Sequence, residues 1–372
     1  MNSIPSLEVF WNKRLVGKLA MSPDQRCAFQ YDPEFIRSGT SISPFFLPLD
    51  GKVFLADHEP FGGMFGVFAD SLSDSWGNLL LDRYWREQGR DPNKLTILER
   101  LALIGSRGRG ALEYSPNRSM AYIAEVENFE RIASKAEQLL ENKCDASTDH
   151  SDLYKYGYTS GGSRPKIFTK IDGEEWLVKF RGKNDPANIG KIEYSYAVLA
   201  QECGIDMPKI RLMEDKYFAI KRFDRTSEGK VHTISAAGLL NASHSVPSLD
   251  YVDLLNVCRI LTADMGQVYQ LFRRAVFNAV ISNRDDHAKN FSFQHRSGRW
   301  QLSPAYDMLP SSGFNSFHTT TFNGKGEPEI EDIMLIAKQV GLNKRRAREI
   351  VEEITEKCEM LNMDIYSLIL PI

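Results

Sequence analysis

The sequence predicts an α+β protein with a small β-rich lobe, a larger helical lobe and an additional α+β domain at the N-terminus. Hairpin patterns dominate residues 153–225, whereas amphipathic helix patterns dominate the chain after residue 249. Strand patterns followed by helix patterns fill the first part of the chain. We therefore expect three domains, which span residues 1–143, 153–225 and 226–372.

Length and composition narrow the class of protein. The 372 residues are 42% hydrophobic, which is enough for two or three packed cores, and the net charge of −3 argues against general nucleic-acid binding. No stretch approaches the about 18 continuous apolar residues of a membrane span, and the N-terminus has no signal-peptide core. The 5 cysteines are scattered without a CxxC pair, which indicates reduced thiols. We expect a cytoplasmic protein.

The first part of the chain has clear turn and helix signals. Residues 7–20 predict two strands around a turn at Asn12-Lys13, with further strands to about residue 56. Helices are predicted from about Ser73, in "NKLTILERLALIG" up to Gly105, and in "VENFERIASKAEQLLENK", with a strand in "GALEYSP". The polar, aperiodic segment 144–152 is predicted to be a linker or mobile loop.

The second part begins with strands and ends with helices. Hairpins are predicted around Asp172-Gly173 and Glu214-Asp215, with the helix "GKIEYSYAVLAQECGI" between them. The longest amphipathic pattern is "DMGQVYQLFRRAVFNAVIS", where Asp264 and Gln267 predict a capping box. Two more helices are expected at the C-terminus. A cleft between two such lobes is a common place for an active site.

The stretch "SNRDDHAKNFSF", residues 282–293, crowds polar side chains between this helix and a predicted hairpin. Asp285 and Asn290 lie five apart, and a hairpin turning at Ser297-Gly298 would return Asp307 beside Asn290. Magnesium prefers such oxygen ligands, and D-x-x-x-x-N followed by an Asp is the order found in protein kinases. Alternatively, these residues only cap or turn the chain.

Two upstream features fit phosphoryl transfer. "YTSGGSRPK", residues 158–166, is a Gly-Gly turn whose backbone N–H groups can approach phosphates, although it lacks the Walker A spacing. Lys179 lies in the apolar strand "EWLVKF", and Glu193 on the next helix is placed to brace it. The alternatives are a solvated strand lysine and a surface glutamate.

These motifs together resemble the HipA-family serine/threonine kinases, the toxins of bacterial HipBA-type toxin–antitoxin modules. The resemblance extends over most of the chain and rests on "VFADSLSDSWG" (67–77), "GSRGRGALEY" (105–114), "TSGGSRPK", "FAIKRFDR" (218–225), "RDDHAKNFS" and "LSPAYDM". It implies a bilobal protein-kinase-like core, with an ATP-binding lobe in residues 153–225 and a catalytic lobe in residues 226–372.

The resemblance also implies roles for individual residues. Asp285 matches the catalytic base, Asn290 and Asp307 the magnesium ligands, and Lys179 the lysine that binds the nucleotide phosphates. Lys289 is placed to touch the γ-phosphate, and His287 to hold the loop by hydrogen bonds. The remaining nucleotide-binding candidates are Thr159, Ser160, Gly161, Gly162, Glu193, Lys221 and Phe223.

Two of these regions differ from the family pattern. Family members often carry a glutamate at the position of Lys221, so its backbone, not its side chain, is the expected contact in the adenine pocket. Family members also autophosphorylate a serine at the start of the Gly-rich loop, which silences the enzyme. Thr159, Ser160 and Ser163 are all candidates for that phosphoacceptor here.

The implied function is an ATP- and Mg²⁺-dependent protein kinase that acts on a translation component such as an aminoacyl-tRNA synthetase. The implied partner is a small helix-turn-helix antitoxin of the HipB type, with DNA bound only through that complex and no membrane contact. One alternative is a non-catalytic kinase-like scaffold or co-repressor. Another is a small-molecule kinase of the aminoglycoside type, which shares the D-x-x-x-x-N order.

Overall fold

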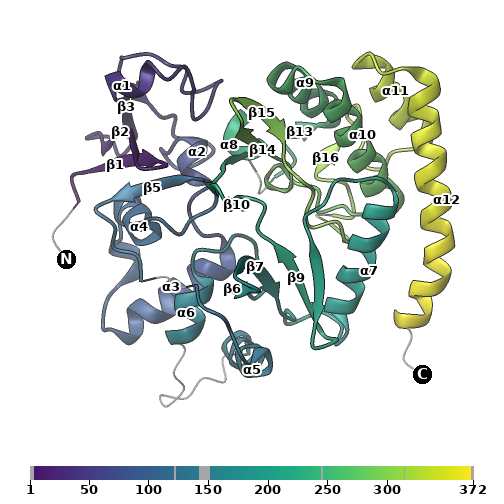
Figure 1. The fold of residues 1–372 in the computed structure, drawn as a ribbon, viewed down its shortest axis with the longest axis horizontal. Helices are drawn as coiled ribbons and strands as arrows, with labels where there is room; N and C mark the ends of the chain where they lie inside the picture. Colours follow the sequence, from purple (N-terminus) through teal and green to yellow (C-terminus); the bar gives the residue numbers. More distant parts are fainter. Residues whose placement is uncertain (1–3, 121–122, 142–150, 244–245, 314, 370–372) are drawn as a thin grey trace. The chain divides into compact units, whose positions relative to one another are not determined.

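The computed structural model describes residues 4–120, 123–141, 151–243, 246–313 and 315–369, and it has the predicted α+β composition (Figure 1). Two compact units divide the chain. The first unit comprises Met1–Gly190, Arg211–Ile234 and Gly238–Leu240, and the second comprises Lys191–Ile210, Ser235–Ala237 and Asn241–Ile372. In the described ranges, no helix combines the length and hydropathy of a membrane span. The predicted domain boundaries stay a prediction, since residues 142–150 lie outside the description.

A five-stranded sheet opens the first unit, with the order β4-β3-β2-β1-β5. The predicted turn is confirmed: Asn12 and Lys13 have φ of 49° and 66°, the left-handed pair that suits a two-residue hairpin. Alternate residues such as Leu7 and Val9 are fully buried on one face. The strands are β1 (Ser6–Trp11), β2 (Arg14–Met21), β3 (Cys27–Tyr31), β4 (Phe54–Leu55) and β5 (Leu112–Ser115).

The helices of this region largely follow the predicted pattern. Thr96 and Glu99 form a capping box at the start of one helix, which ends at Gly105 with φ of 56°. The described helices are α1 (Pro33–Ile36), α2 (Gly66–Ala69), α3 (Ser75–Glu87), η1 (Pro92–Lys94), α4 (Ile97–Ile104) and α5 (Phe129–Leu140).

The predicted linker at 144–152 is wrong at its end, because Ser151 begins a further helix, α6 (Ser151–Gly157). The rest of that segment lies outside the described residues. The helix is too short for a periodic pattern, and stacking stabilises it: the Tyr154 ring lies 4.0 Å from the ring of Tyr84 and 4.4 Å from that of Tyr158. Sequence periodicity does not report such contacts.

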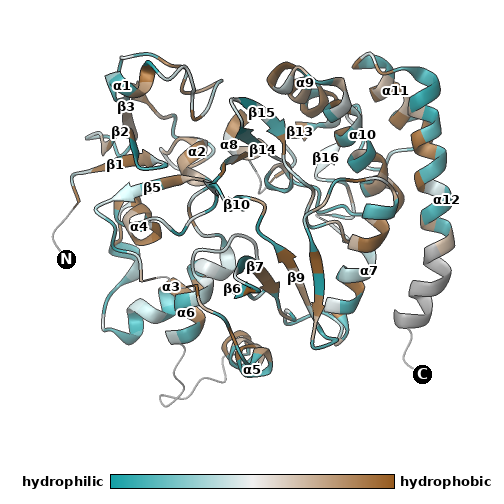
Figure 2. Ribbon diagram, viewed as in Figure 1, coloured by the Kyte–Doolittle hydropathy of each residue, from teal (hydrophilic) through white to brown (hydrophobic). Residues whose placement is uncertain are grey.

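The second sheet of this unit has the order β6-β7-β9-β8. Its predicted turns are confirmed by left-handed residues at Asp172-Gly173 and Glu214-Asp215. Figure 2 shows hydrophobic residues along β7 and β9, and Trp176 and Val178 are fully buried. The strands are β6 (Lys166–Ile171), β7 (Glu174–Lys179), β8 (Ile210–Met213) and β9 (Tyr217–Lys221), followed by the short pair β10 (Arg225–Thr226) and β11 (Gly229–Lys230).

The second unit is mainly helical. The predicted capping box is wrong: Asp264 caps its helix through the Gly266 N–H, but the Gln267 side chain instead accepts the Leu302 N–H. The elements are α7 (Ile189–Glu202), β12 (His232–Ser235) and α8 (Ala236–Leu240) at the junctions, then β13 (Leu249–Asp250), α9 (Tyr251–Thr262), α10 (Met265–Val280), η2 (Ala288–Asn290), β14 (Ser292–Arg296), β15 (Arg299–Leu302), β16 (Thr320–Thr321), α11 (Ile330–Gln339) and α12 (Lys344–Ile369).

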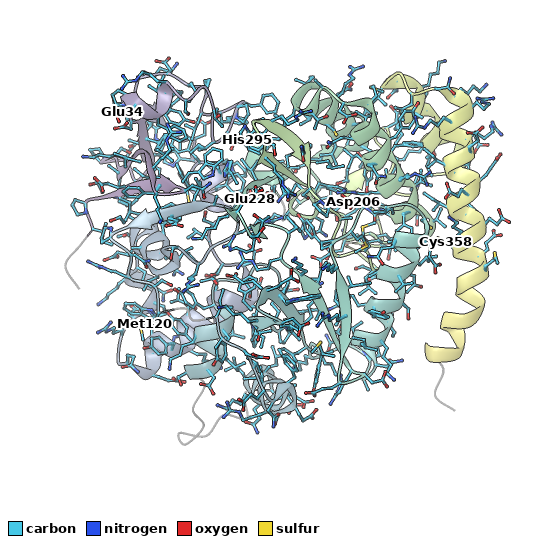
Figure 3. The ribbon with its side chains drawn as sticks, in the orientation of Figure 1. Glu34, Met120, Asp206, Glu228, His295 and Cys358 are labelled. Atoms are coloured by element: carbon cyan, nitrogen blue, oxygen red, sulfur yellow. The ribbon has the colours of Figure 1, made fainter. Side chains whose placement is uncertain are left out.

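The cysteines agree with the prediction of reduced thiols within the described part of the chain. Cys27, Cys203, Cys258 and Cys358 are buried and free, and Figure 3 shows Cys358 on α12. Burial raises the pKa of Cys27 and of Cys258 to about 12, so both thiols stay protonated and unreactive near neutral pH.

A buried charge cluster joins two loops of the first unit. The Asp224 carboxylate accepts the Gly110 N–H at 2.8 Å and hydrogen bonds from Arg222 at 2.8 Å and Arg225 at 2.9 Å. Burial alone would raise the pKa of the Asp224 carboxyl, but the two guanidinium groups outweigh burial and hold that pKa far below its usual range. The RFDR segment is thereby fixed to the loop that precedes β5.

The Asp224→Asn variant tests this cluster. At pH 7 we expect the free energy of unfolding to fall by about 3 kcal/mol, because two buried guanidinium groups lose their shared carboxylate. A depressed pKa in the folded state means that this stabilisation is complete above about pH 4 and declines in more acid solution. The difference between variant and wild type in thermal melts should therefore shrink as the pH falls below about 4. Asp57→Asn, at an exposed position, is the control. A pH-independent difference would contradict the assignment.

Candidate active site

The polar loop 283–290 begins where α10 ends, with Ser282 in the left-handed region at φ of 55°. Asn283 is buried, and its Nδ2 donates to Asn278 Oδ1 on α10 and to the carbonyl oxygen of Asp307, both at 3.0 Å. The start of the loop is therefore tied to α10 and to the segment that carries Asp307.

Asp286 anchors the middle of this loop, a role that the sequence analysis missed. Its carboxylate is fully buried and receives the Tyr251 hydroxyl, His318 Nδ1 and the Thr319 N–H, each at 2.8 Å, and the Thr320 N–H at 3.2 Å. Burial, followed by the Asp286 charge, raises the pKa of Tyr251 well above its usual value, so the hydroxyl remains a donor. The sequence feature that could have indicated this role is the position of Asp286 directly after Asp285, the expected catalytic base.

Asp285, the residue before Asp286, is exposed, as a reacting group requires. His287 holds the loop as expected: its Nδ1 accepts the Lys289 N–H at 3.2 Å, and its Nε2 lies 3.9 Å from Asp285 Oδ1. Asp286 is thus a buried structural residue, whereas its neighbour Asp285 is exposed.

The predicted hairpin returns the chain beside the loop. β14 and β15 turn at Ser297-Gly298, and the Tyr306 hydroxyl donates to the Lys289 carbonyl oxygen at 2.7 Å. Asp307 follows with φ of 55°, a backbone conformation that is uncommon outside glycine and is often found at functional sites. The segments carrying Asp285, Asn290 and Asp307 therefore lie side by side in the second unit.

The chemistry of these oxygen donors fits magnesium. Asn290 Nδ2 donates to the Asp285 carbonyl oxygen at 2.7 Å, so its amide oxygen remains an acceptor. Asp307 would add one carboxylate. In the described ranges no group of three or more His, Cys, Asp and Glu is arranged so that it could hold a metal ion. A small ligand set of this kind is typical of magnesium, which keeps waters and substrate phosphates in its shell.

The Gly-rich loop lies in the first unit, between α6 and β6. Gly162 has φ of 87°, which favours glycine. Thr159 and Ser160 are buried, and the Ser160 hydroxyl donates to the Gly157 carbonyl oxygen at 2.6 Å, whereas Ser163 is exposed. In this conformation Ser163 is the most accessible of the three candidate phosphoacceptors.

Two buried lysines lie on β6 and β7, the strands that follow this loop in the chain. Lys179 is buried at the end of β7, with its Nζ 5.6 Å from the centre of the Phe218 ring. Lys166 is also buried and pairs with Lys179 across the antiparallel β6–β7 ladder, so both side chains share one face. The sequence analysis did not name Lys166 as a candidate. Its position directly after the Gly-rich turn could have indicated it.

The other nucleotide-binding candidates stay predictions. The Lys221 ammonium forms an ion pair with Glu174 on the neighbouring strand. Phe223 is partly buried. Glu193 is a buried residue of α7. Lys289 follows His287 in the polar loop and is partly exposed.

Comparison with known proteins identifies relatives of both parts of the chain. The family models described as HipA N-terminal domain and HipA-like C-terminal domain match residues 7–115 and 158–361. A Sinorhizobium fredii (strain NBRC 101917 / NGR234) protein named "Putative kinase Y4dM" is 31% identical over 155 residues, 37% of either chain. A Haemophilus influenzae protein named "Putative kinase" is 23% identical over 259 residues, 57% of this chain and 75% of that one.

A solved structure shares the fold. It is a chain from the Shewanella oneidensis MR-1 toxin–antitoxin complex of HipA, HipB and operator DNA, with a TM-score of 0.71 and 16% identity. The superposition covers 98% of this chain and 92% of that one. The similarity therefore extends over the N-terminal region as well as the part that carries the polar loop.

The variants Asp286→Asn and Asp285→Asn test whether Asp286, and not Asp285, stabilises the loop. Asp286→Asn should lower the free energy of unfolding by about 3 kcal/mol, because four buried donors lose a charged acceptor. Asp285→Asn, exposed and adjacent, should change it by less than about 0.5 kcal/mol. Urea denaturation followed by circular dichroism measures both values. Equal stability of the two variants would contradict the anchoring role of Asp286.

Proposed function

The chain belongs to the HipA family, and on that premise we propose that it is an ATP- and Mg²⁺-dependent protein serine/threonine kinase, the toxin component of a toxin–antitoxin module. The observation that carries the proposal is the fixed loop that presents Asp285 and Asn290 next to the segment of Asp307. The relatives named as kinases support the same activity class.

In the proposed reaction, Asp285 orients the acceptor hydroxyl and takes its proton. The hydroxyl oxygen then bonds to the γ-phosphorus of ATP, the bond to the bridging oxygen breaks, and ADP leaves. Asn290 and Asp307 would hold magnesium, which when bound offsets the charge of the phosphates. The protein contributes mainly positioning and fixed charge.

The paired lysines support a phosphate-binding role for the first unit. Lys166 and Lys179 place two ammonium groups on the same face of β6 and β7, where both are buried. Two ammonium groups on one face suit the several negative charges of a polyphosphate. The adjacent Gly-rich loop would supply backbone N–H groups.

Autophosphorylation is part of the proposal. Ser163 is exposed, so its hydroxyl can meet a γ-phosphate without rearrangement of the loop. Thr159 and Ser160 are buried and would have to leave their present contacts first. Phosphate adds about −1.5 to −2 charge, which would repel ATP phosphates beside the same loop.

Partner and substrate are inferred from the family and from the solved neighbour. The Shewanella structure contains HipB and operator DNA, so we propose a small DNA-binding antitoxin as partner, with DNA bound through it. A translation component such as an aminoacyl-tRNA synthetase is the proposed substrate.

Asp285→Asn should lower phosphoryl transfer by about a hundredfold or more, since general-base catalysis alone contributes that much. Asp307→Asn should cause a loss of similar size, because magnesium would lose its carboxylate ligand. Turnover of ATP with cell lysate as acceptor and circular dichroism are measured together. Asp253→Asn, exposed at the start of α9, should keep wild-type turnover. Near wild-type activity in either site variant would refute the site. Inactive wild-type protein would favour the non-catalytic scaffold, and transfer to small metabolites would favour the small-molecule kinase.

A further inference from the structure

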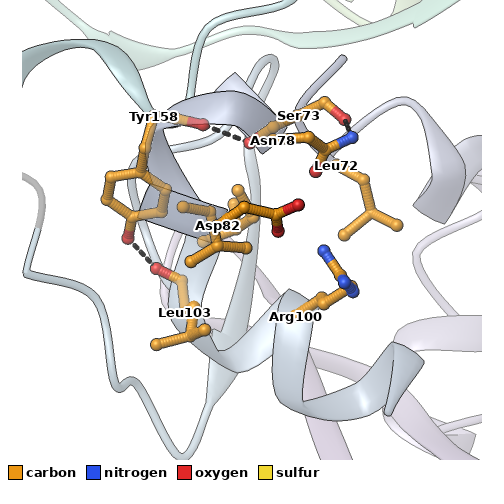
Figure 4. Close-up of a pocket in the computed structure, with 9 residues that line it drawn as sticks. Leu72, Ser73, Asn78, Asp82, Arg100, Leu103 and Tyr158 are labelled. Atoms are coloured by element: carbon orange, nitrogen blue, oxygen red, sulfur yellow. Dashed lines mark hydrogen bonds between the residues drawn. The ribbon is translucent and has the colours of Figure 1, made fainter. Parts of the chain in front are cut away.

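The Gly-rich loop, residues 158–163, packs against the start of α3 within the first unit. Gly162 makes a hydrogen bond in each direction: its N–H donates to Asp74 Oδ2 at 2.8 Å, and its carbonyl oxygen accepts the Trp76 N–H at 3.1 Å. The Ser73 hydroxyl donates to the Tyr158 carbonyl oxygen (Figure 4). We call residues 73–77 the loop seat.

The Asp74 side chain binds the Gly-rich loop and does not cap its own helix. Asp74 is the N-cap residue of α3, where an Asp ordinarily accepts an N–H from the first turn of its own helix. Here the side chain makes no capping hydrogen bond, and its carboxylate accepts the N–H of Gly162 instead. The free Trp76 N–H of the helix terminus is satisfied by Gly162 in return. The start of α3 and the Gly-rich loop therefore satisfy each other's backbone hydrogen-bonding groups.

The shapes of the loop seat and the loop also match. A Cβ on Gly77 would lie 2.3 Å from the Tyr158 carbonyl oxygen and 3.0 Å from that of Ser160, so only glycine permits this approach. On the other side of the loop, a Cβ on Gly162 would lie 2.4 Å from the Lys166 Nζ. Gly162 is thus held between the Asp74 carboxylate and the lysine face of β6 and β7.

We propose that Asp74 is a positioning residue for the nucleotide: it holds the Gly-rich loop in the conformation that faces Lys166 and Lys179. This inference rests on the proposed ATP site. Two adjacent glycines leave a free loop many conformations, and ordering them on binding opposes affinity. The hydrogen bonds to the loop seat restrict that freedom before ATP arrives.

The test uses three variants of the full chain. Asp74→Ala removes the acceptor, and Asp74→Asn keeps a neutral acceptor oxygen. Asp82→Ala is the matched control, because Asp82 lies on the same helix and lines the adjacent cavity of about 330 Å³ (Figure 4). Amide hydrogen exchange of the segment 159–163 is measured without nucleotide. MgATP affinity is measured by calorimetry, with EDTA and Lys179→Ala as controls for the ATP site itself.

We expect Asp74→Ala to speed exchange in 159–163 and to weaken MgATP binding roughly tenfold, the value of one hydrogen bond to a charged group. Asp74→Asn should recover most of both losses, and Asp82→Ala should match wild type. Unchanged or tighter MgATP binding by Asp74→Ala would overturn the proposal, as would unchanged exchange. If wild type binds no MgATP, the proposed function fails, and the exchange data still decide whether Asp74 holds the loop.

Discussion

The buried carboxylate of Asp286 is the constraint on which the conformation of the polar loop 283–290 depends. A fully buried carboxylate must find donors, and four of them converge on it from α9 and from the segment 318–320. The network continues from Tyr251 to Asn278 and Asn283, and from Asn283 to the carbonyl oxygen of Asp307. One set of hydrogen bonds therefore fixes both segments that carry the proposed reacting and metal-binding groups.

The same device recurs in the first unit. Asp224 accepts a backbone N–H from the loop before β5, and Asp74 accepts one from the Gly-rich loop. In each case a carboxylate accepts a hydrogen bond from a loop N–H that would otherwise bind water. The loop is thereby held by a residue that is distant in the sequence. Hydrogen bonds to charged acceptors are stronger than neutral ones, which suits loops whose own backbone offers few contacts.

Local signals made much of this fold predictable. The turns at Asn12-Lys13, Asp172-Gly173 and Glu214-Asp215 require left-handed residues, and the sequence supplies residues that tolerate that backbone conformation. Family motifs indicated the segments of Asp285, Asn290 and Asp307, and the hairpin signal at Ser297-Gly298 predicted their proximity.

Contacts between distant segments were not predictable in this way. α6 depends on stacking of its Tyr154 with Tyr84 of α3 and with Tyr158, which follows α6. The Gln267 side chain binds a hairpin N–H and not the capping box that was expected. Asp286 and Lys166 gain their importance from burial and from cross-strand pairing, which a single sequence does not display. The support of the Gly-rich loop by Asp74 likewise joins residues far apart in the chain.

The central claim is that this chain transfers phosphate from ATP. The most direct test is to incubate the purified chain with MgATP and to map the phosphorylated residues. Intact-mass and peptide mass spectrometry should find a phosphoryl group on the Gly-rich loop, with Ser163 as the accessible hydroxyl and Thr159 and Ser160 as the sites that require the loop to leave its seat. The modification should be absent from samples with EDTA and from Asp285→Asn protein. A folded wild-type chain that gains no phosphate on itself or on any lysate protein would contradict the kinase assignment.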